Sequence, residues 1–449
     1  MLRFLDPAEH YFWILDQVSS MNFVVIAELK QTFNSKDFEQ ALSVLQAQLT
    51  EEAIFNLVVQ STAEGRLYFE THQDSISLET LNSRQAAHKV LAKYLPQKFT
   101  LDEPLVRAFY INHSQQNRSS IALMFNHAIA DGKTGMALLR RWLDLHAEVL
   151  SEQAGSIIST PSLACQQPLL QANAPLHQLL PTYFTLSANA DSNAPQVQLS
   201  ELLEQRKNDL RRFGRPDALT LTNSQPETSQ PETFAIELDT AQLQQLQQAC
   251  KRAKCSVHGA LMAAQLLTIK QLETDDKNRE LTLCLTSPVD LRRFFADKHH
   301  DIGMYTSLVY SAYRIGSNTD FWSLAQQASK EIKLQLERGD ASHFYHLAGT
   351  TDIPLLPEAM AQFKVQILKS APQSLISNIG VIPDTGLDYV QQLSFALCPI
   401  PSQPIFTAVT SYKGVLRLNI THDQSQTQPE VIQLLVENMK QRLLESCFI

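Results

Sequence analysis

Apolar and polar positions along the chain follow two periods, which together predict a mixture of strands and helices. Short apolar runs between turn residues are typical of strands, whereas apolar residues three or four positions apart indicate amphipathic helices. Strands are predicted at residues 23–29, 56–60, 66–70, 105–112, 119–127, 234–238, 281–286, 306–313, 374–379, 405–412 and 415–422. Helices are predicted at residues 35–48, 84–95, 132–150, 199–212, 242–254, 257–272, 321–337 and 429–445, with Ser35 as the expected N-cap of the first. The pattern therefore predicts an α/β protein.

The order of these elements recurs loosely in two halves of the chain, which indicates two subdomains. Residues 151–198 lie between the halves and are rich in Pro, Gln, Ser, Ala and Asn, a composition typical of a connection. We expect an N-terminal subdomain over residues 1–150, a crossover linker over 151–198 and a C-terminal subdomain over 199–449. Residues 223–233 contain the polar near-repeat SQPETSQPET and predict a loop.

The segment Asn126-His127-Ala128-Ile129-Ala130-Asp131-Gly132 joins a predicted strand to a predicted helix. Strand alternation places His127 at the end of the strand's apolar row. A neutral imidazole in such a place can accept a proton from a hydroxyl, amine or thiol near neutral pH. Gly132 allows a tight turn or the close approach of a substrate. A structural role fits as well, with Asp131 as a helix N-cap and His127 as a core histidine, so the spacing alone leaves both interpretations open.

The same segment resembles the His-x-x-x-Asp-Gly signature of the CoA-dependent acyltransferase superfamily. That superfamily includes chloramphenicol acetyltransferase, the condensation domains of nonribosomal peptide synthetases, alcohol acetyltransferases and mycobacterial polyketide-associated acyltransferases. Three further stretches resemble it in the expected order: SVHGALMAA at residues 256–264, SPVDLR at 287–292 and SNIG at 377–380. The resemblance covers nearly the whole chain. It implies two related α/β sandwiches that form a V, with an active-site tunnel between them.

The resemblance also implies a reaction and a set of site residues. An acyl group would pass from a thioester, on CoA or an acyl carrier protein, to a hydroxyl or amine acceptor by direct attack, with His127 as general base. Asp131 would pair with Arg292 and, with Gly132, would support the loop that carries His127. Asn378 and Ser377 are the candidates for contact with the oxyanion or the substrate, and Asn126 is a third.

Two departures from the superfamily pattern narrow the branch. Asn126 stands where condensation domains usually carry a first histidine, and the chain has no Asp-Phe-Gly-Trp-Gly motif of the plant-type branch. These departures favour a free-standing acyltransferase that forms an ester or amide, nearest to the bacterial alcohol acyltransferases and the mycobacterial polyketide-associated group. Two alternatives stay open: a condensation-type domain that forms amides on carrier-bound substrates, and a non-catalytic relative that binds ligands.

Composition excludes several classes of function. The 449 residues carry a formal charge of −9 and no clustered stripe of Lys and Arg, which argues against a nucleic-acid surface. The six cysteines are scattered, which suits a reducing cytoplasm. No apolar run approaches the roughly 18 residues of a membrane span, and the N-terminus does not resemble a signal peptide. The histidines at 299–300 and at 343 and 346 lack a third ligand nearby, so we expect no metal. We expect a monomer without a bound cofactor, in which the acyl-CoA or phosphopantetheine-linked donor is a substrate.

Overall fold

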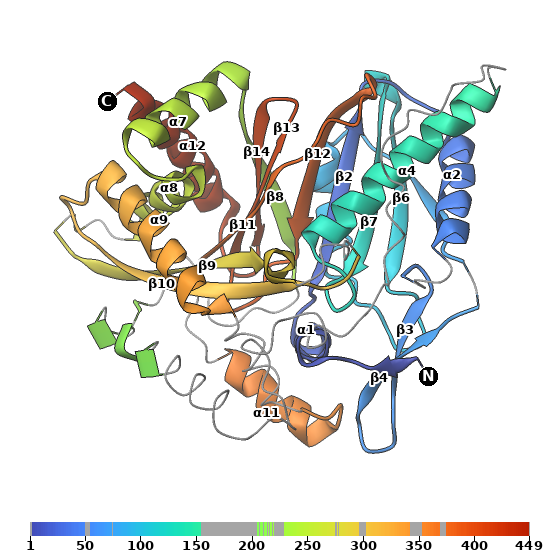
Figure 1. The fold of residues 1–449 in the computed structure, drawn as a ribbon, viewed down its shortest axis with the longest axis horizontal. Helices are drawn as coiled ribbons and strands as arrows, with labels where there is room; N and C mark the ends of the chain where they lie inside the picture. Colours follow the sequence, from blue (N-terminus) through green and yellow to red (C-terminus); the bar gives the residue numbers. More distant parts are fainter. Residues whose placement is uncertain are drawn as a thin grey trace.

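A computed structural model of the chain describes residues 2–49, 54–73, 75–153, 229–273, 278–295, 302–341, 353–368 and 374–448, with residue 276 and scattered residues between 204 and 219. The described strands form three sheets, and helices pack against the two larger ones (Figure 1). A five-stranded sheet lies mainly in the N-terminal half and a six-stranded sheet in the C-terminal half. The predicted α/β class, with two halves side by side, is therefore confirmed.

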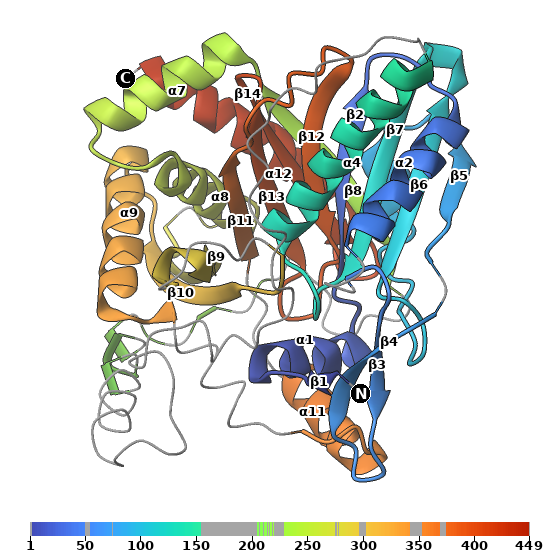
Figure 2. The ribbon, with the colours of Figure 1, turned by 45° about the vertical axis from the view of Figure 1, so that its right-hand side comes forward.

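The five-stranded sheet carries the predicted histidine motif at the end of one central strand. Its order is β12 (Val390–Leu397), β2 (Asn22–Leu29), β7 (Arg118–Asn126), β6 (Val106–His113) and β5 (Leu78–Asn82). Alternate residues of β7 enter different cores: Leu123 and Phe125 join the main core, whereas Met124 joins a smaller one behind the sheet. Helices α2 (Ser35–Gln48) and α4 (Gly132–Gln153) cover the side of the main core (Figure 2).

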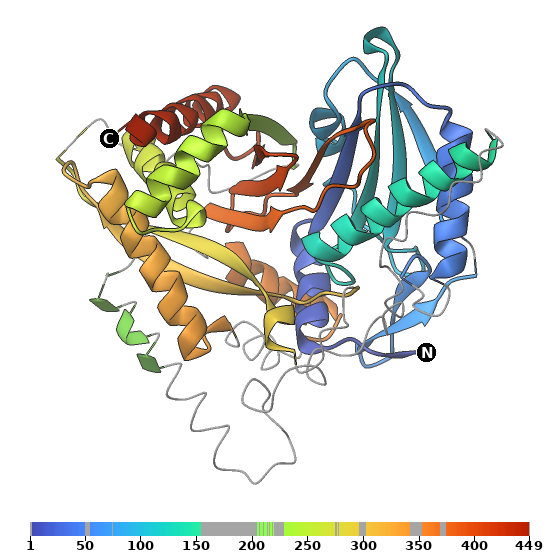
Figure 3. The ribbon, with the colours of Figure 1, turned by 45° about the horizontal axis from the view of Figure 1, so that its top comes forward.

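The six-stranded sheet forms the second half and has its own core. Its order is β10 (Thr306–Ile315), β9 (Leu281–Asp290), β11 (Ser374–Val381), β13 (Ile405–Tyr412), β14 (Val415–Asp423) and β8 (Pro231–Leu238). The helices α7 (Thr240–Arg252), α8 (Val257–Glu273), α9 (Phe321–Arg338) and α12 (Pro429–Glu445) gather on its outer side (Figure 3). Most residues of α8 are buried, because this helix lies between the sheet and the other helices.

A third group of elements lies below the junction of the two halves. Helices α1 (Pro7–Val18) and α11 (Pro357–Leu368) pack together there, with the rings of Tyr11 and Phe363 5.9 Å apart (Figure 2). The small sheet of β1 (Arg3–Phe4), β4 (Leu67–Thr71) and β3 (Leu57–Ser61) lies beside them. Asp6 and Glu9 form a capping box at the start of α1, which fixes where this helix begins.

The chain crosses between the two sheets in its last third. β11 belongs to the six-stranded sheet, the next strand β12 pairs antiparallel with β2 of the five-stranded sheet, and β13 returns to the six-stranded sheet. Phe23 of β2 pairs with Leu397 of β12. The predicted division at residues 151–198 stays a prediction, since residues 154–200 lie outside the described residues.

Most predicted elements are present, with changes at several boundaries. The N-cap of α2 is Asn34 and not Ser35, because the Asn34 side chain accepts from the Lys36 backbone. The helix predicted at 84–95 is the short α3 (Ala87–Ala92). The predicted loop at 223–233 overlaps β8, whose pairing with β14 extends to Pro231. Within the helix predicted at 199–212, the described residues 204, 205, 207–209, 211 and 212 are helical. Helices α1 and α11 and strands β1, β5 and β12 were not predicted.

Candidate active site

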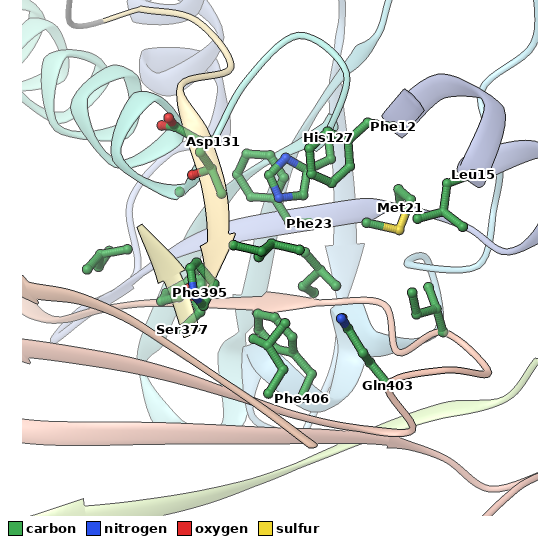
Figure 4. Close-up of a pocket in the computed structure, with 18 of the residues that line it drawn as sticks. Phe12, Leu15, Met21, Phe23, His127, Asp131, Ser377, Phe395, Gln403 and Phe406 are labelled. Carbon is green, nitrogen blue, oxygen red and sulfur yellow. The ribbon is translucent and has the colours of Figure 1, made fainter. Parts of the chain in front are cut away.

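A cavity of about 220 Å³, the first cavity, lies where the two halves meet α1 and α11. Its wall combines residues of α1, β2, the loop after β7, β9, β10, β11, β12 and β13, so both sheets contribute. Its lining includes Tyr11, Phe12, Leu15, Met21, Phe23, His127, Asp131, Gly132, Lys133, Asp290, Arg292, Ser377, Asn378, Ile379, Phe395, Gln403 and Phe406. Figure 4 shows His127 on one side of this cavity, with Ser377, Gln403 and Phe406 across from it.

The imidazole of His127 is held rigidly in the cavity wall. β7 ends at Asn126, so the next side chain continues the strand's apolar row and reaches the cavity. The ring of Phe12 stacks on the imidazole at 4.5 Å, and the ring of Phe23 lies 5.1 Å from it (Figure 4). His127 is 9% exposed as a result. Two aromatic rings from two different elements therefore fix the plane of the imidazole.

A single hydrogen bond determines which nitrogen of His127 carries the proton. Nδ1 lies 2.9 Å from the carbonyl oxygen of Ala130. A carbonyl only accepts, so Nδ1 must donate, and the lone pair of the neutral ring is left on Nε2. Burial lowers the pKa of His127 below its ordinary value, although the charge of Asp131 and the bond to Ala130 act in the opposite direction. The ring is therefore neutral near pH 7, with Nε2 available as a base.

Asp131 makes the predicted ion pair with Arg292, and this pair connects the two halves. The guanidinium donates from Nη1 to Oδ2 at 2.8 Å and from Nη2 to Oδ1 at 3.1 Å. The carboxylate also accepts from the backbone nitrogens of Thr134 and Tyr305. Burial would raise the pKa of Asp131, but the charge and hydrogen bonds of Arg292 outweigh it and lower that pKa. Figure 4 shows the carboxylate turned away from His127, so Asp131 supports the loop without orienting the imidazole directly.

Two glycines allow the loop of His127 to pack this closely. A Cβ on Gly132 would lie 3.2 Å from Cγ2 of Ile379 on β11, so this position permits the first half to approach the second. Gly303 has φ +149°, and a Cβ there would overlap the ring of Tyr305. The carbonyl oxygen of Gly303 accepts from the hydroxyl of Thr134 at 2.7 Å, and Thr134 also accepts from Arg292. Gly132 therefore serves close packing between the halves, whereas its predicted roles in a tight turn or in the close approach of a substrate stay predictions.

The other predicted residues divide into two that line the cavity and one that does not. Asn378 lies on β11, and its Oδ1 accepts from the backbone of Gly380 at 2.9 Å, which leaves its Nδ2 as a donor. Ser377 is nearly buried beside it and also lines the first cavity. Asn126 is fully buried, does not line the cavity and accepts from the backbone of Ala128. The structure therefore brings His127, Ser377 and Asn378 to one cavity and places Asn126 behind it.

A second cavity, of about 510 Å³, borders the first. Lys133, Pro288, Asp290 and Asn378 line both cavities. The second cavity also has Arg293 and the serines 256, 287 and 329 in its wall, so it is more polar than the first. His258 lies in it and its Nε2 is 2.9 Å from the hydroxyl of Ser287.

Several residues of the site were not predicted from the sequence. Phe12 and Phe23 clamp the imidazole, and Thr134 and Gly303 hold its loop, yet none of them belongs to a motif. The cluster of aromatic and aliphatic residues in the segment that forms α1 is a signal that could have indicated Phe12. Thr134 lies three residues after Asp131, which is the usual spacing for a backbone nitrogen that donates to an N-cap side chain.

The described ranges contain neither a candidate metal cluster nor a candidate membrane span. No three His, Cys, Asp or Glu side chains suited to a metal ion gather there. His299, His300, Asp301, His343 and His346 lie outside the described residues. Among the helices described, none has both the length and the apolar character that crossing a membrane requires.

Comparisons with known proteins indicate which family and which folds this chain resembles. Residues 227–388 match the family described as phthiocerol/phthiodiolone dimycocerosyl transferase C-terminus, a range that includes Arg292 and Asn378 but not the motif of His127. The fold is similar to trichothecene 15-O-acetyltransferase from Fusarium sporotrichioides, with a TM-score of 0.72, 12% identity, and coverage of 99% of this chain and 94% of that one. The chain has the fold of the CoA-dependent acyltransferase and condensation-domain superfamily.

Two further solved structures extend this superfamily likeness. The first condensation domain of the calcium-dependent antibiotic synthetase has a TM-score of 0.68 and 13% identity, with coverage of 100% of this chain and 97% of that one. Polyketide synthase associated protein 5 from Mycobacterium tuberculosis has a TM-score of 0.61 and 14% identity, with coverage of 97% of each chain. A comparison with curated protein sequences found no match.

Proposed function

We propose that this protein is an acyltransferase that moves an acyl group from a thioester to a hydroxyl or amine acceptor, with His127 as general base. The observation that carries the proposal is the hydrogen bond from Nδ1 of His127 to Ala130, because it leaves a basic Nε2 at a cavity shared by both halves. The superfamily fold and the family match at residues 227–388 support acyl transfer as the reaction class.

The chemistry follows from the placement of these groups. The acceptor's oxygen or nitrogen attacks the thioester carbonyl while its proton passes to Nε2 of His127. The oxyanion that forms is stabilised by Nδ2 of Asn378, whose orientation is fixed by the bond from Gly380. When the C–S bond breaks, the imidazolium returns the proton to the leaving thiolate. The bond to Ala130 keeps the ring in one orientation throughout both transfers.

The two cavities provide separate places for donor and acceptor. We place the polar arm of the thioester in the second cavity, since its wall holds the cations Lys133 and Arg293 and several hydroxyls. The acyl carbonyl then reaches the border of the cavities, beside Asn378. The acceptor lies in the first cavity, within reach of His127. Phe395 and Phe406 in its wall favour acceptors with apolar parts.

Thiol release from a panel of acyl-CoAs, with mixed small alcohols and amines, tests this function. Removing a general base costs on the order of a hundred- to ten-thousand-fold in rate, so His127→Ala is expected to lose acceptor-dependent release by that factor. The matched control is His113→Ala, since His113 at the end of β6 is also buried but contacts the carbonyl of Ser83 and the hydroxyl of Ser120 and lines neither cavity. Equal release by wild type and His127→Ala would remove His127 from the chemistry.

The same panel separates the ester-forming from the amide-forming alternative. Product analysis by mass spectrometry identifies which acceptors become acylated. Activity that appears only when the acyl group is presented on a carrier protein would favour the condensation-type alternative. Binding of acyl-CoA without turnover for every acceptor would favour the non-catalytic one.

A further inference from the structure

Two cysteines lie at the end of helix α7, where the chain turns before α8 begins. Cys250 is in the last turn of α7 and is 3% exposed, whereas Cys255 follows the turn and is half-buried. Both are free thiols, and neither lines the first or the second cavity. The proposed acyl transfer gives them no role.

The turn between the two cysteines is a Schellman motif, a common way for a helix to end. Lys254 has φ +53°, and its backbone nitrogen donates to the carbonyl of Lys251 at 3.2 Å. The backbone nitrogen of Cys255 donates to the carbonyl of Cys250 at 3.0 Å. These are the 5→2 and 6→1 bonds of the motif, in which the side chains of the first and last residues often contact each other. Here both of those residues are cysteines.

The geometry of this turn suits a bond between the two sulfur atoms. Backbone bond lengths and the 3.0 Å hydrogen bond limit the separation of the two Cα atoms to about 7 Å, which is the reach of a disulfide. The side chains also face each other, because the thiols of Cys250 and Cys255 share a hydrogen bond. A disulfide needs both a short Cα separation and side chains that point together.

The hydrogen bond between the thiols determines which of them ionises first. Burial raises the pKa of both thiols. The hydrogen bond raises the pKa of Cys250 further and lowers that of Cys255, so Cys250 is the donor and Cys255 is the first to become a thiolate. Cys255 is also the more exposed of the two. An oxidant in solution therefore meets Cys255 first.

A third thiol lies near this pair but is engaged elsewhere. Cys447 lies on η3 (Ser446–Phe448), close enough to Cys250 for its charge to raise the pKa of that thiol. Its own thiol donates to the carbonyl of Leu443 at 3.2 Å, which favours Cys255 as the partner of Cys250. Within the described residues the three thiols do not form a cluster suited to a metal ion. Oxidation of the pair is the chemistry that this arrangement favours.

We propose that Cys250 and Cys255 form a reversible disulfide, with a hydroperoxide as the oxidant and a small thiol as the reductant. The thiolate of Cys255 attacks an oxygen of the hydroperoxide, the O–O bond breaks, and an alcohol or water leaves with the proton. The sulfur of Cys250 then attacks the sulfenic acid on Cys255, the S–S bond forms, and the hydroxyl leaves as water. The two thiols lose two protons and two electrons in all, which the hydroperoxide takes up.

Peptide mapping tests this site without any measurement of acyl transfer. The reduced full-length protein is treated with hydrogen peroxide, its remaining thiols are alkylated, and it is cut with trypsin without reduction. Trypsin cuts after Lys251, Arg252 and Lys254, so the disulfide joins two peptides that are separate in the reduced protein. We expect this linked pair as the main cross-link, lighter by two hydrogen atoms than its two parts, and we expect dithiothreitol to release both.

Two other products would overturn the proposal. A cross-link of Cys250 to Cys447 would mean that the third thiol is the true partner. Sulfinic acid on Cys255 without a cross-link would mean that Cys250 does not reach it in time.

Serine variants test the order of the two steps. In Cys250→Ser the sulfenic acid on Cys255 cannot be resolved, so a dimedone probe should label it. In Cys255→Ser the buried Cys250 is left alone, and labelling should be at least about tenfold weaker. Cys447→Ser is the matched control and should form the disulfide at a rate within about twofold of wild type. Equal labelling of the first two variants would contradict the assigned order, and loss of the cross-link in the control would contradict the assigned pair.

The pH dependence of the oxidation gives a further test. Only the thiolate reacts, and burial raises the pKa of Cys255, so the rate of disulfide formation should rise about tenfold per pH unit between about pH 7 and about pH 8.5. The titratable groups that act on Cys250 are Cys255 and Cys447, and Arg252 acts on Cys447 from the same turn. The same slope is expected in Cys447→Ser. A rate that does not change with pH would mean that Cys255 is already ionised at pH 7 and would overturn the proposed first step.

Discussion

His127 and His258 each line one of the two adjoining cavities, yet their hydrogen bonds leave them in different chemical situations. His127 bonds to a carbonyl, which can only accept, so its proton lies on Nδ1 and its lone pair on Nε2. His258 bonds through Nε2 to the hydroxyl of Ser287, which can donate or accept, so neither tautomer is imposed. Burial lowers the pKa of both rings, that of His258 to about 4. The partner atom, more than the pKa, therefore distinguishes the proposed general base His127, with one tautomer, from His258, whose tautomer is left open.

The largest expected effect comes from breaking the ion pair between Asp131 and Arg292, which supports the loop of His127 and has no equivalent at His258 in the description above. Arg292→Met leaves the carboxylate of Asp131 buried without its cation, and loss of one partner of a buried ion pair costs about 3–5 kcal/mol. The free energy of unfolding, measured with urea, should fall by this amount. Arg293→Met is the matched control, because Arg293 is exposed and surface substitutions usually change stability by less than about 0.5 kcal/mol. Similar losses in both variants would refute the bridging role of Arg292.

Substitution of the second histidine should affect binding more than chemistry. We expect His258→Ala to raise KM for the acyl-CoA by about tenfold, roughly the 1.4 kcal/mol of one hydrogen bond, with a much smaller change in kcat. His127→Ala should show the reverse, with the loss mainly in kcat. Steady-state kinetics with donor and acceptor varied separately measure both. A loss of kcat in His258→Ala as deep as in His127→Ala would mean that the comparison between the two histidines fails.

A smaller effect is expected at the contact between the halves. In Gly132→Ala the new methyl group lies 3.2 Å from Cγ2 of Ile379, so Ile379 must shift by a few tenths of an ångström toward the first cavity. We expect kcat/KM to fall a few-fold, well below the hundredfold that a misplacement of about 1 Å can cost. Stability should change little. An unchanged kcat/KM with several acceptors would show that the cavity does not depend on this contact.

The smallest effect concerns the pH profile of the wild type. A histidine with its ordinary pKa of about 6.5 would be half protonated at that pH and would lose half of its activity as a base. Because burial lowers the pKa of His127, the neutral base persists to lower pH, and the acid limb of kcat/KM should lie below pH 6.5. A limb above pH 6.5 would contradict the assignment of His127 as the titrating base.

Local sequence patterns predicted the parts of the site that depend on short-range spacing. The alternation of the strand predicted His127 at its end, and the pairing of Asp131 with Arg292 followed from the resemblance. β12 was missed because both of its faces are buried, so its sequence shows no alternation, and its partner β2 lies at the other end of the chain.

The aromatic clamp was missed for a related reason. Phe12 lies on α1, a helix buried on most sides, where an apolar stripe cannot be distinguished from its background. Asn126 was considered as a contact for the substrate, since a motif shows which residues are close in sequence but not which way each one faces. The fold places Asn126 behind the cavity wall, where it accepts from the backbone of Ala128.

The crossing of β12 has a consequence for the way the protein is made. During synthesis β2 emerges from the ribosome early, but its neighbour at residues 390–397 emerges only after most of the second half. Until then β2 is an open sheet edge, the kind of surface that pairs with other chains. Contacts so distant along the chain also slow folding. The first half should therefore need protection from aggregation by a chaperone, and truncation before residue 390 should yield insoluble protein even though the motif of His127 is intact.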